Sequence, residues 1–301
     1  MAAITTSRRM TTARRERLGY LLFVVPAFLY IVFFFGYPLV KNVWMGFVDF
    51  RTSTFINGHA PWVGVANYAE VLSDPVVPLA TWNTIVITVA TVVAQLVIGL
   101  ALATFFAKRF AGSRFYSSSM LLPWLLPLVT TAAVWRWLLQ ERGPLMTLLA
   151  PLGVTGSPLA DPDVALIAMI IVNIWLGIPF YVIILGAALQ GVPLDQLEAA
   201  QLDGAGRFGR FWHIVLPSIR PQVLVAATLS VIYTLKILEL PLILTGGGPA
   251  NATQTLGTVA YTLSFKQFEF GQGAAVGNLL MLITLVVAIV YVYFGARKEE
   301  R

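Results

Sequence analysis

Six long apolar stretches dominate this 301-residue sequence and decide what it can fold into. A bilayer core about 30 Å thick is crossed by roughly 20 mostly apolar helical residues. Because lipid offers no hydrogen-bond partner to the backbone, only helices and closed barrels span it, and these stretches lack the period-two alternation of barrel strands. We therefore predict an all-α membrane protein with six transmembrane helices. The expected spans are residues 18–40, 82–107, 115–139, 164–189, 221–242 and 273–294.

The composition supports a membrane fold and argues against several kinds of site. Of the residues, 58% are hydrophobic and 11% are charged, whereas soluble domains carry about 25% charged residues. The chain has no cysteine and only two histidines, His59 and His213. Thiol chemistry is therefore excluded, and a multi-histidine metal centre is not expected. We expect no metal site, no catalytic residue and no covalent chemistry on this chain.

The basic residues indicate how the chain is oriented. Alternate connections and both tails carry fourteen of the 20 Lys and Arg residues, and the opposite side carries six. Because cytoplasmic segments are enriched in Lys and Arg, both termini are expected in the cytoplasm. The basic residues adjoin apolar runs instead of forming a patch, so no nucleic-acid partner is expected. We predict a tail at residues 1–17, a membrane domain at 18–296 and a second tail at 297–301.

The cytoplasmic connection at residues 190–220 is long and rich in helix signals. Asp195 and Glu198 have the spacing of a capping box, which predicts a helix start, and Gly204 suits the C-terminal cap of that helix. Aromatic residues then recur at helical spacing up to Pro217. We expect a short helix, a glycine turn and a second amphipathic segment. This pattern alone fits either an interfacial helix on lipid headgroups or a docking element for a soluble partner.

The same residues resemble the EAA motif of permease subunits in binding-protein-dependent ABC importers. Glu198-Ala199-Ala200 is followed by Asp203-Gly204-Ala205 and, after nine residues beyond the glycine, by Ile214-Val215-Leu216-Pro217. In that family the loop forms a coupling helix that sits in a groove of the ATP-binding subunit. The resemblance implies ATPase-coupling roles for Glu198, Ala199, Ala200, Asp203 and Gly204.

Further segments resemble the carbohydrate-uptake branch of this family, in particular its MalF-like first permease. They are Asn173-Ile174-Trp175-Leu176-Gly177, Thr245-Gly246-Gly247-Gly248-Pro249, and the tract 261–271 followed by Ala274-Ala275. The similarity runs from about residue 160 to the C-terminus, and the first three spans fit by hydropathy only. The outer loop after the first span is much shorter than the inserted domain of the enterobacterial maltose permease, so any function of that domain is not expected here.

The resemblance also implies what the chain works with. A second, MalG-like permease would form the pathway together with it, with two ATP-binding subunits below and an extracytoplasmic solute-binding protein above. It implies a type I importer fold in the inner membrane, in contact with lipid, that moves a disaccharide, an oligosaccharide or a glycerol phosphate derivative by alternating access. The chain contains no P-loop pattern. ATP and Mg²⁺ are therefore expected on the partner ATPase, and no cofactor on this chain.

Polar residues near the middle of the membrane are the candidates for the substrate pathway. Span five begins near Pro221, so at about 1.5 Å per residue Tyr233 and Thr234 lie about 18–20 Å along it. Asn173 reaches a similar depth from the other side. By resemblance to the family's sugar-contacting positions, the expected pathway residues are Asn173, Gly177, Ser230, Tyr233 and Thr234. The alternative is that such hydroxyl and amide groups bond neighbouring helices.

Two other functions remain compatible with the sequence. An ion-coupled secondary transporter tends to carry carboxylates or histidines inside its spans, and Glu239 is the only acidic candidate there. Lys236 and Glu239, three residues apart in span five, are expected to pair with each other, and the alternative is a substrate or gating contact. A non-transporting membrane scaffold would use the loop at 190–220 to bind a soluble partner and would have no functional pocket.

Overall fold

The computed structural model describes residues 23–108 and 110–296, and this part of the chain is helical. Within these ranges it has no strand, and one isolated antiparallel bridge joins Val48 to Trp62. Four helices are long and apolar enough to cross a membrane alone, and two bent helix pairs bring the number to six if each pair is one span. The predicted all-helical membrane fold is confirmed. The tails at 1–17 and 297–301, with their basic residues, lie outside the described residues.

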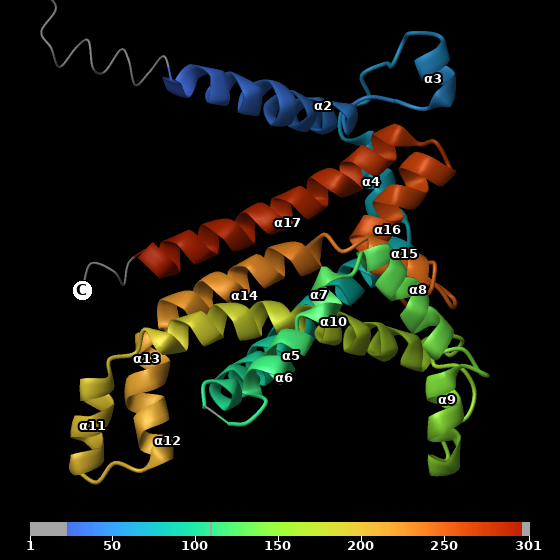
Figure 1. Ribbon diagram of the computed structural model, residues 1–301. Coiled ribbons are helices and arrows are strands. Elements are labelled where there is room, and N and C mark those ends of the chain that lie inside the picture. Colours follow the sequence, from blue (N-terminus) through green and yellow to red (C-terminus); the bar gives the residue numbers. More distant parts are fainter. Residues whose placement is uncertain (1–22, 109, 297–301) are drawn as a thin grey trace, which may run out of the picture.

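The helices follow the chain in the order that Figure 1 shows. The first span, Phe23–Met45, contains a π-helical turn, η1 (Val32–Gly36), and α2 (Tyr37–Met45). The elements that follow, up to the fourth predicted span, are α3 (Thr52–Ile56), α4 (Ala66–Ser73), α5 (Val76–Phe106), α6 (Ser113–Ser119), α7 (Leu122–Leu125), α8 (Leu128–Leu138), α9 (Pro144–Leu149), the 3₁₀ turn η2 (Ala150–Leu152) and α10 (Pro162–Gln190). The rest are α11 (Leu194–Leu202), α12 (Arg207–Arg210), the π-helical turn η3 (Phe211–Val215), α13 (Leu216–Ser218), α14 (Arg220–Leu235), α15 (Glu239–Leu244), α16 (Leu256–Tyr261), the π-helical turn η4 (Thr262–Lys266) and α17 (Phe270–Ala296).

The third predicted span, 115–139, is not one straight helix. Its two halves, Phe115–Leu125 and Leu128–Leu138, meet at an angle of 98°. The break lies at Leu126, which has an extended backbone (ψ 141°) and precedes Pro127. The ring of a proline clashes with a helical residue before it, which explains the extended conformation. Hydropathy does not register this local constraint.

The fifth predicted span, 221–242, is also interrupted. α14 ends at Leu235, and α15 begins at Glu239 after a short non-helical stretch. Among the described residues no ion pair joins Lys236 to Glu239, and the Lys236 ammonium instead lies 5.5 Å from the centroid of the Tyr233 ring. The predicted pairing is wrong because it assumed a continuous helix, and the break removes the i, i+3 geometry that brings such side chains together.

α5, α10 and α14 form the centre of the molecule. α5 and α10 have the most extensive contact of any helix pair, and α14 packs against α5. A seam of small and polar residues lies buried along α5: Thr84, Thr88, Thr91, Gln95, Gly99 and Ala103. A Cβ on Gly99 would lie 2.4 Å from the Cβ of Tyr181 on α10, so only glycine permits this approach. Small residues play this part in membranes because lipid is as apolar as the helices themselves.

The first span stands apart from this centre. None of its spanning residues is buried in the rest of the chain. It is anchored near Met45, where Asn42 Nδ2 donates to Asn278 Oδ1 of α17 at 2.8 Å and Asn278 Nδ2 donates to the Tyr68 hydroxyl at 2.8 Å. Figure 1 shows α2 and α17 meeting at this end and diverging toward the other.

Candidate functional site

The loop at residues 190–220 forms a helical hairpin that projects from one end of the membrane helices, at the lower left of Figure 1. α11 is one arm, and α12 with η3 is the other. Apolar side chains on the hairpin are open to solvent, among them Leu202, which is 89% exposed, and Phe208, which is 77% exposed. Grouped exposed apolar residues typically mark a surface that another molecule covers.

The start of α11 differs from the prediction. Pro193 is its N-cap, no side-chain cap bond forms, and the helix begins at Leu194. Asp195 therefore lies inside the first turn, where its carboxylate favours the positive end of the helix dipole. The predicted capping box of Asp195 and Glu198 is wrong, since a helix that begins earlier moves both residues out of the capping positions.

The predicted end of α11 is confirmed. Gly204 has φ +81°, and the helix closes through bonds from Gly204 N to Gln201 O at 3.1 Å and from Ala205 N to Ala200 O at 2.9 Å. This pair of bonds is the Schellman motif, whose left-handed position favours glycine. The glycine turns the chain so that the second arm can return along α11.

A side-chain bond then holds the two arms together. Arg210 Nη1 donates to Gln201 Oε1 at 2.7 Å. The predicted coupling residues lie together on α11 and its C-terminal cap, with Glu198, Ala199, Asp203 and Gly204 exposed and Ala200 half-buried. The hairpin thus presents these residues as one projecting surface.

Three of the predicted pathway residues surround Gln95, which is not among the predicted residues. Gln95 on α5 is 4% exposed and bridges two other helices. Its Nε2 donates to the backbone oxygen of Asn173 on α10 at 2.8 Å, and its Oε1 accepts from Ser230 Oγ on α14 at 3.0 Å. A Cβ on Gly177 would lie 2.0 Å from Gln95 Nε2, so the glycine leaves the space that the amide fills.

Asn173, Gly177 and Ser230 are thus brought together around Gln95. Asn173 Nδ2 also donates to Thr91 Oγ1 on α5, at 3.3 Å. In this conformation their polar groups bond neighbouring helices, which is the alternative role that such residues have in membranes. The sequence does contain a signal for Gln95, because it is a lone glutamine one turn after Thr91 in an apolar span. Its partners cannot be read from the sequence, because they are far away along the chain.

The other two predicted pathway residues occupy different surroundings. Thr234 is buried, whereas Tyr233 is 66% exposed. The Tyr233 ring stands beside the Lys236 ammonium at the end of α14, a cation–π geometry. Of the five predicted residues, Tyr233 presents the largest open surface.

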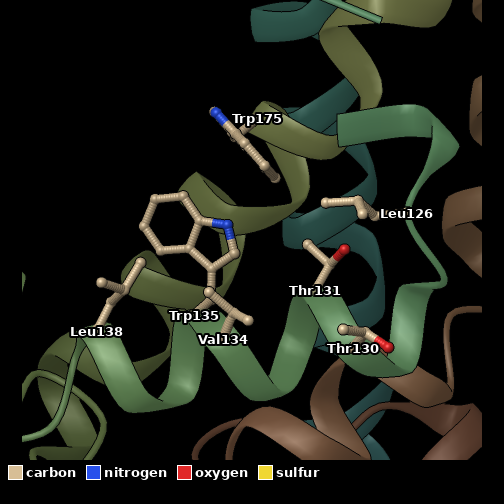
Figure 2. A pocket seen from close by; sticks show the side chains of 7 residues that line it. All are labelled: Leu126, Thr130, Thr131, Val134, Trp135, Leu138 and Trp175. Carbon is tan, nitrogen blue, oxygen red and sulfur yellow. The ribbon is translucent and has the colours of Figure 1, made fainter. Parts of the chain in front are cut away.

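Two cavities lie on the opposite face of α10. One, of about 220 Å³, is lined by α8 and α10 and contains Trp135 and Trp175, whose rings meet edge to face at 5.4 Å. Figure 2 shows the two indoles on one side of the pocket and Leu126 and Thr131 on the other. The second, of about 590 Å³, lies on the other side of Leu126 and Trp175. Trp175 is two residues from Asn173 and from Gly177, so at 3.6 residues per turn it points away from the Gln95 network.

The Thr-Gly-Gly-Gly-Pro segment forms a turn that side-chain hydrogen bonds hold in place, at the end of the molecule opposite the hairpin. Gly248-Pro249 is a cis peptide, and Thr253 Oγ1 donates to Gly248 O at 2.7 Å. Asn83 Nδ2 of α5 donates to the backbone oxygens of Ala252 and Gln254, both at 3.0 Å. Non-helical backbone at the edge of a membrane needs such partners because lipid supplies none.

Comparison with known proteins identifies the family. The family model "binding-protein-dependent transport system inner membrane component" matches residues 95–300, from Gln95 through the hairpin to α17. The chain belongs to this family. The first span, α3 and α4 lie outside the matched segment. The predicted permease family is thereby confirmed, and the chain is a membrane component of ABC importers.

Individual relatives extend over nearly the whole permease. It is 32% identical to the trehalose/maltose transport system permease protein MalF of Thermococcus litoralis, over 95% of this chain and 96% of that one. It is 31% identical to the sulfoquinovosyl glycerol transport system permease protein SmoG of Agrobacterium fabrum, over 94% and 92%. It is 30% identical to the diacetylchitobiose uptake system permease protein DasB of Streptomyces coelicolor, over 98% and 92%.

Solved structures confirm the permease fold. A chain of a bacterial ABC transporter involved in the import of the acidic polysaccharide alginate matches with a TM-score of 0.80, 20% identity, and coverage of 95% of this chain and 97% of that one. A second structure of a bacterial alginate ABC transporter, in complex with an alginate pentasaccharide-bound periplasmic protein, matches with a TM-score of 0.81, 20% identity and coverage of 97% and 98%. At this identity the likeness concerns the fold.

Proposed function

We propose that this permease is the transmembrane subunit of an ATP-driven importer that carries a carbohydrate or glycoside by alternating access. The observation that carries the proposal is the projecting hairpin of α11 and α12, which presents exposed apolar residues and the EAA-like residues at one end of the spans. On this proposal the hairpin docks on an ATP-binding subunit. Leu202 and Phe208 then lose their exposed apolar surface to a partner, which stabilises the contact by roughly 1.5–3 kcal/mol for each fully buried side chain.

The substrate class is supported by the names of similar proteins. The three relatives described above are named for trehalose/maltose, sulfoquinovosyl glycerol and diacetylchitobiose. All three names denote saccharides or glycosides, and the sequence places hydroxyl, amide and aromatic groups on the central spans. The proposed solute is a disaccharide, an oligosaccharide or a glycerol phosphate derivative.

The ATP site belongs to a partner. The chain has no P-loop pattern, so ATP and Mg²⁺ are held by the two ATP-binding subunits, and this subunit is non-catalytic. ATP binding closes the ATPase dimer, and α11 moves with it. The second arm of the hairpin, Arg207–Ser218, leads into α14, Arg220–Leu235, through a bend of 68°. A displacement of the hairpin is therefore passed directly to the end of α14.

A second, MalG-like permease and an extracytoplasmic solute-binding protein complete the proposed importer. The exposed ring of Tyr233 faces the second permease across the pathway, and Asn173, Gly177, Ser230 and Thr234 line or support that pathway on this subunit. The hairpin and both termini lie on the cytoplasmic side. The turn at 245–254 and α9 then lie on the outer side.

A copurification experiment tests the proposal at the hairpin. Leu202→Glu places a charge on a side chain that makes little contact within the chain, so the fold is unaffected. Ile56→Glu, at a position on α3 that is 75% exposed and lies at the opposite end of the spans, is the matched control. Tagged wild type and the control are expected to retain both the ATP-binding subunits and the second permease, whereas Leu202→Glu keeps the permease and loses the ATPase.

Uptake into proteoliposomes separates transport classes. The assembled complex is expected to take up a labelled disaccharide only with ATP on the hairpin side and with its binding protein present, and uptake should withstand an ionophore that collapses ion gradients. Uptake that follows an ion gradient without ATP would instead identify a secondary transporter. Assembly with an ATPase but no uptake of any saccharide or glycoside would contradict the proposed substrate class and leave the coupling role intact.

A further inference from the structure

The connection between α8 and α10 has an unusual chemical character. From Gly143 to Ala160 it contains no charged residue and no histidine, with Glu141 and Arg142 directly before this stretch and Asp161 directly after it. It includes α9 and η2, and it lies at the end of α10 opposite the coupling hairpin, at the lower right of Figure 1. Leu148 is 73% exposed and Leu152 is 77% exposed. An uncharged stretch of this length with Leu148 and Leu152 outward does not suit contact with water.

The connection is nevertheless a fixed structure. Met146 is buried in a core cluster that includes Leu139 of the α8 end and Met169 of α10. Ser157 Oγ donates to Leu139 O at 2.8 Å, and Thr147 Oγ1 donates to Gly143 O at 2.9 Å. Because these hydroxyls are bonded within the chain, moving the connection out of water leaves them without a desolvation penalty.

The other connection at the same end provides a contrast. Residues 46–75 contain Asp49, Arg51, His59, Glu70 and Asp74. The Arg51 guanidinium lies 2.6 Å from Asp49 and 3.6 Å from Glu269, and its hydrogen bond to Asp49 raises the pKa of Arg51. Charged groups of this kind, more than a quarter exposed, belong in water. The charges of this connection are spread along its length, whereas those of the α8–α10 connection stand only at its two ends.

We propose that the segment Gly143–Val154 is a lipid-contact element that lies in the headgroup region of the bilayer leaflet at this end. Interfacial segments rest in this region with their apolar residues toward the acyl chains and their charged groups toward the headgroups, and the exposed Glu141 and Arg142 directly before the segment supply such groups. Trp137, one residue before the end of α8, is exposed beside the segment, and tryptophan concentrates at this depth of a membrane.

The element has a mechanical consequence. α9 is tied to the ends of α8 and α10 through Met146 and Ser157. Lipid contact at Leu148 and Leu152 therefore holds these two helix ends at a fixed depth, while the hairpin end of α10 remains free to follow a partner. This inference does not depend on which solute is carried, or on whether the proposed transport is correct.

Because the chain contains no cysteine, single cysteines can be introduced without other changes. Leu148→Cys and Leu152→Cys are compared with Asn57→Cys in the charged connection, all in exposed positions where labelling removes no core contact. Each variant is labelled with an environment-sensitive fluorophore such as NBD and reconstituted, as the assembled complex, into phosphatidylcholine vesicles. Emission is then measured with brominated phosphatidylcholine and, separately, with aqueous iodide.

The expected result is blue-shifted emission at positions 148 and 152, strong quenching by brominated lipid and weak quenching by iodide, with the opposite pattern at position 57. Iodide quenching at 148 and 152 equal to that at 57 would overturn the proposal, because the segment would lie in water. Protection from both quenchers would overturn it as well, since a protein would then cover the segment. Iodide quenching that is lost when the solute-binding protein is added would assign the surface to that partner instead.

Discussion

Gln95 and Gly177 depend on each other at the centre of the molecule. The Gln95 amide fills the space that the missing Cβ of Gly177 leaves open, and it bonds Asn173 and Ser230 from there. Overpacking at such a site destabilises by about 1–3 kcal/mol because the displaced side chain must leave its rotamer. We expect Gly177→Ala to lower the thermal unfolding temperature of the purified complex and to reduce uptake.

The double variant makes this expectation specific. Gln95→Ser shortens the side chain that the new methyl group would meet, so Gly177→Ala should be less destabilising in a Gln95→Ser background. Residues in direct contact show coupling free energies of about 0.5–3 kcal/mol. Additive effects of the two substitutions on unfolding would contradict the packing that we describe.

Single residues were only partly predictable from the sequence. The family resemblance predicts three residues that do lie together: Asn173, Gly177 and Ser230. It does not predict Gln95, the residue that joins them. A polar side chain inside an apolar span must find a partner, which marks Gln95 as noteworthy. Its partners Asn173 and Ser230 are 78 and 135 residues away, and only the packing of α5 against α10 and α14 shows which groups meet.

The glycine turn of the hairpin allows a prediction for a whole element. Gly204 has φ +81° and Gly206 has φ −64°, and a Cβ at either position would meet nothing within 4 Å. Backbone strain alone therefore distinguishes them. An L-residue in the left-handed conformation costs roughly 1–2 kcal/mol. Gly204→Ala should loosen the end of α11, whereas Gly206→Ala should not.

Amide hydrogen exchange measures this difference. A loss of about 1.4 kcal/mol corresponds to tenfold faster exchange from locally opened states. We expect faster exchange in α11 of Gly204→Ala, weaker retention of the ATPase, and wild-type behaviour of Gly206→Ala. Equal exchange in the two variants would mean that the Schellman bonds do not determine the end of α11.

Elements were predictable where one physical signal decides them. Hydropathy placed α5, α10 and α17 within several residues, because each is a long run that nothing interrupts. It failed at Leu126 and at the Lys236–Leu238 break, where local backbone geometry and non-local packing decide the path. The start of α11 was misplaced for a similar reason, since Pro193 ends the preceding turn before Asp195 can act as a cap.

The arrangement of the whole molecule is the level at which the sequence was least informative. The six apolar stretches do not reveal which helices pack together. In the structure, none of the residues that span the membrane in the first helix is buried by the other five spans. Most of its apolar surface must be covered by lipid or by another subunit, because α17 contacts it without burying any of its residues. The hydrogen bonds around Asn278 are then what fixes where this helix leaves the body of the subunit.

Asn278 therefore tests how the first span is held. Asn278→Leu keeps the approximate shape of the side chain and removes its bonds to Asn42, Val43 and Tyr68. Hydrogen bonds between membrane helices average about 0.6 kcal/mol and reach about 1.7 kcal/mol, so losing those to Asn42 and Val43 of the first span shifts the population of the released position by roughly one order of magnitude. The apolar contact of α2 with α17 remains, so we expect a graded loosening instead of detachment.

Spin labels at Val40→Cys and Leu282→Cys, both exposed, should give a broader distance distribution in Asn278→Leu. Asn83→Leu, which loses two bonds to the 252–254 turn, should leave that distribution narrow, and equal broadening in both variants would show that Asn278 has no special role.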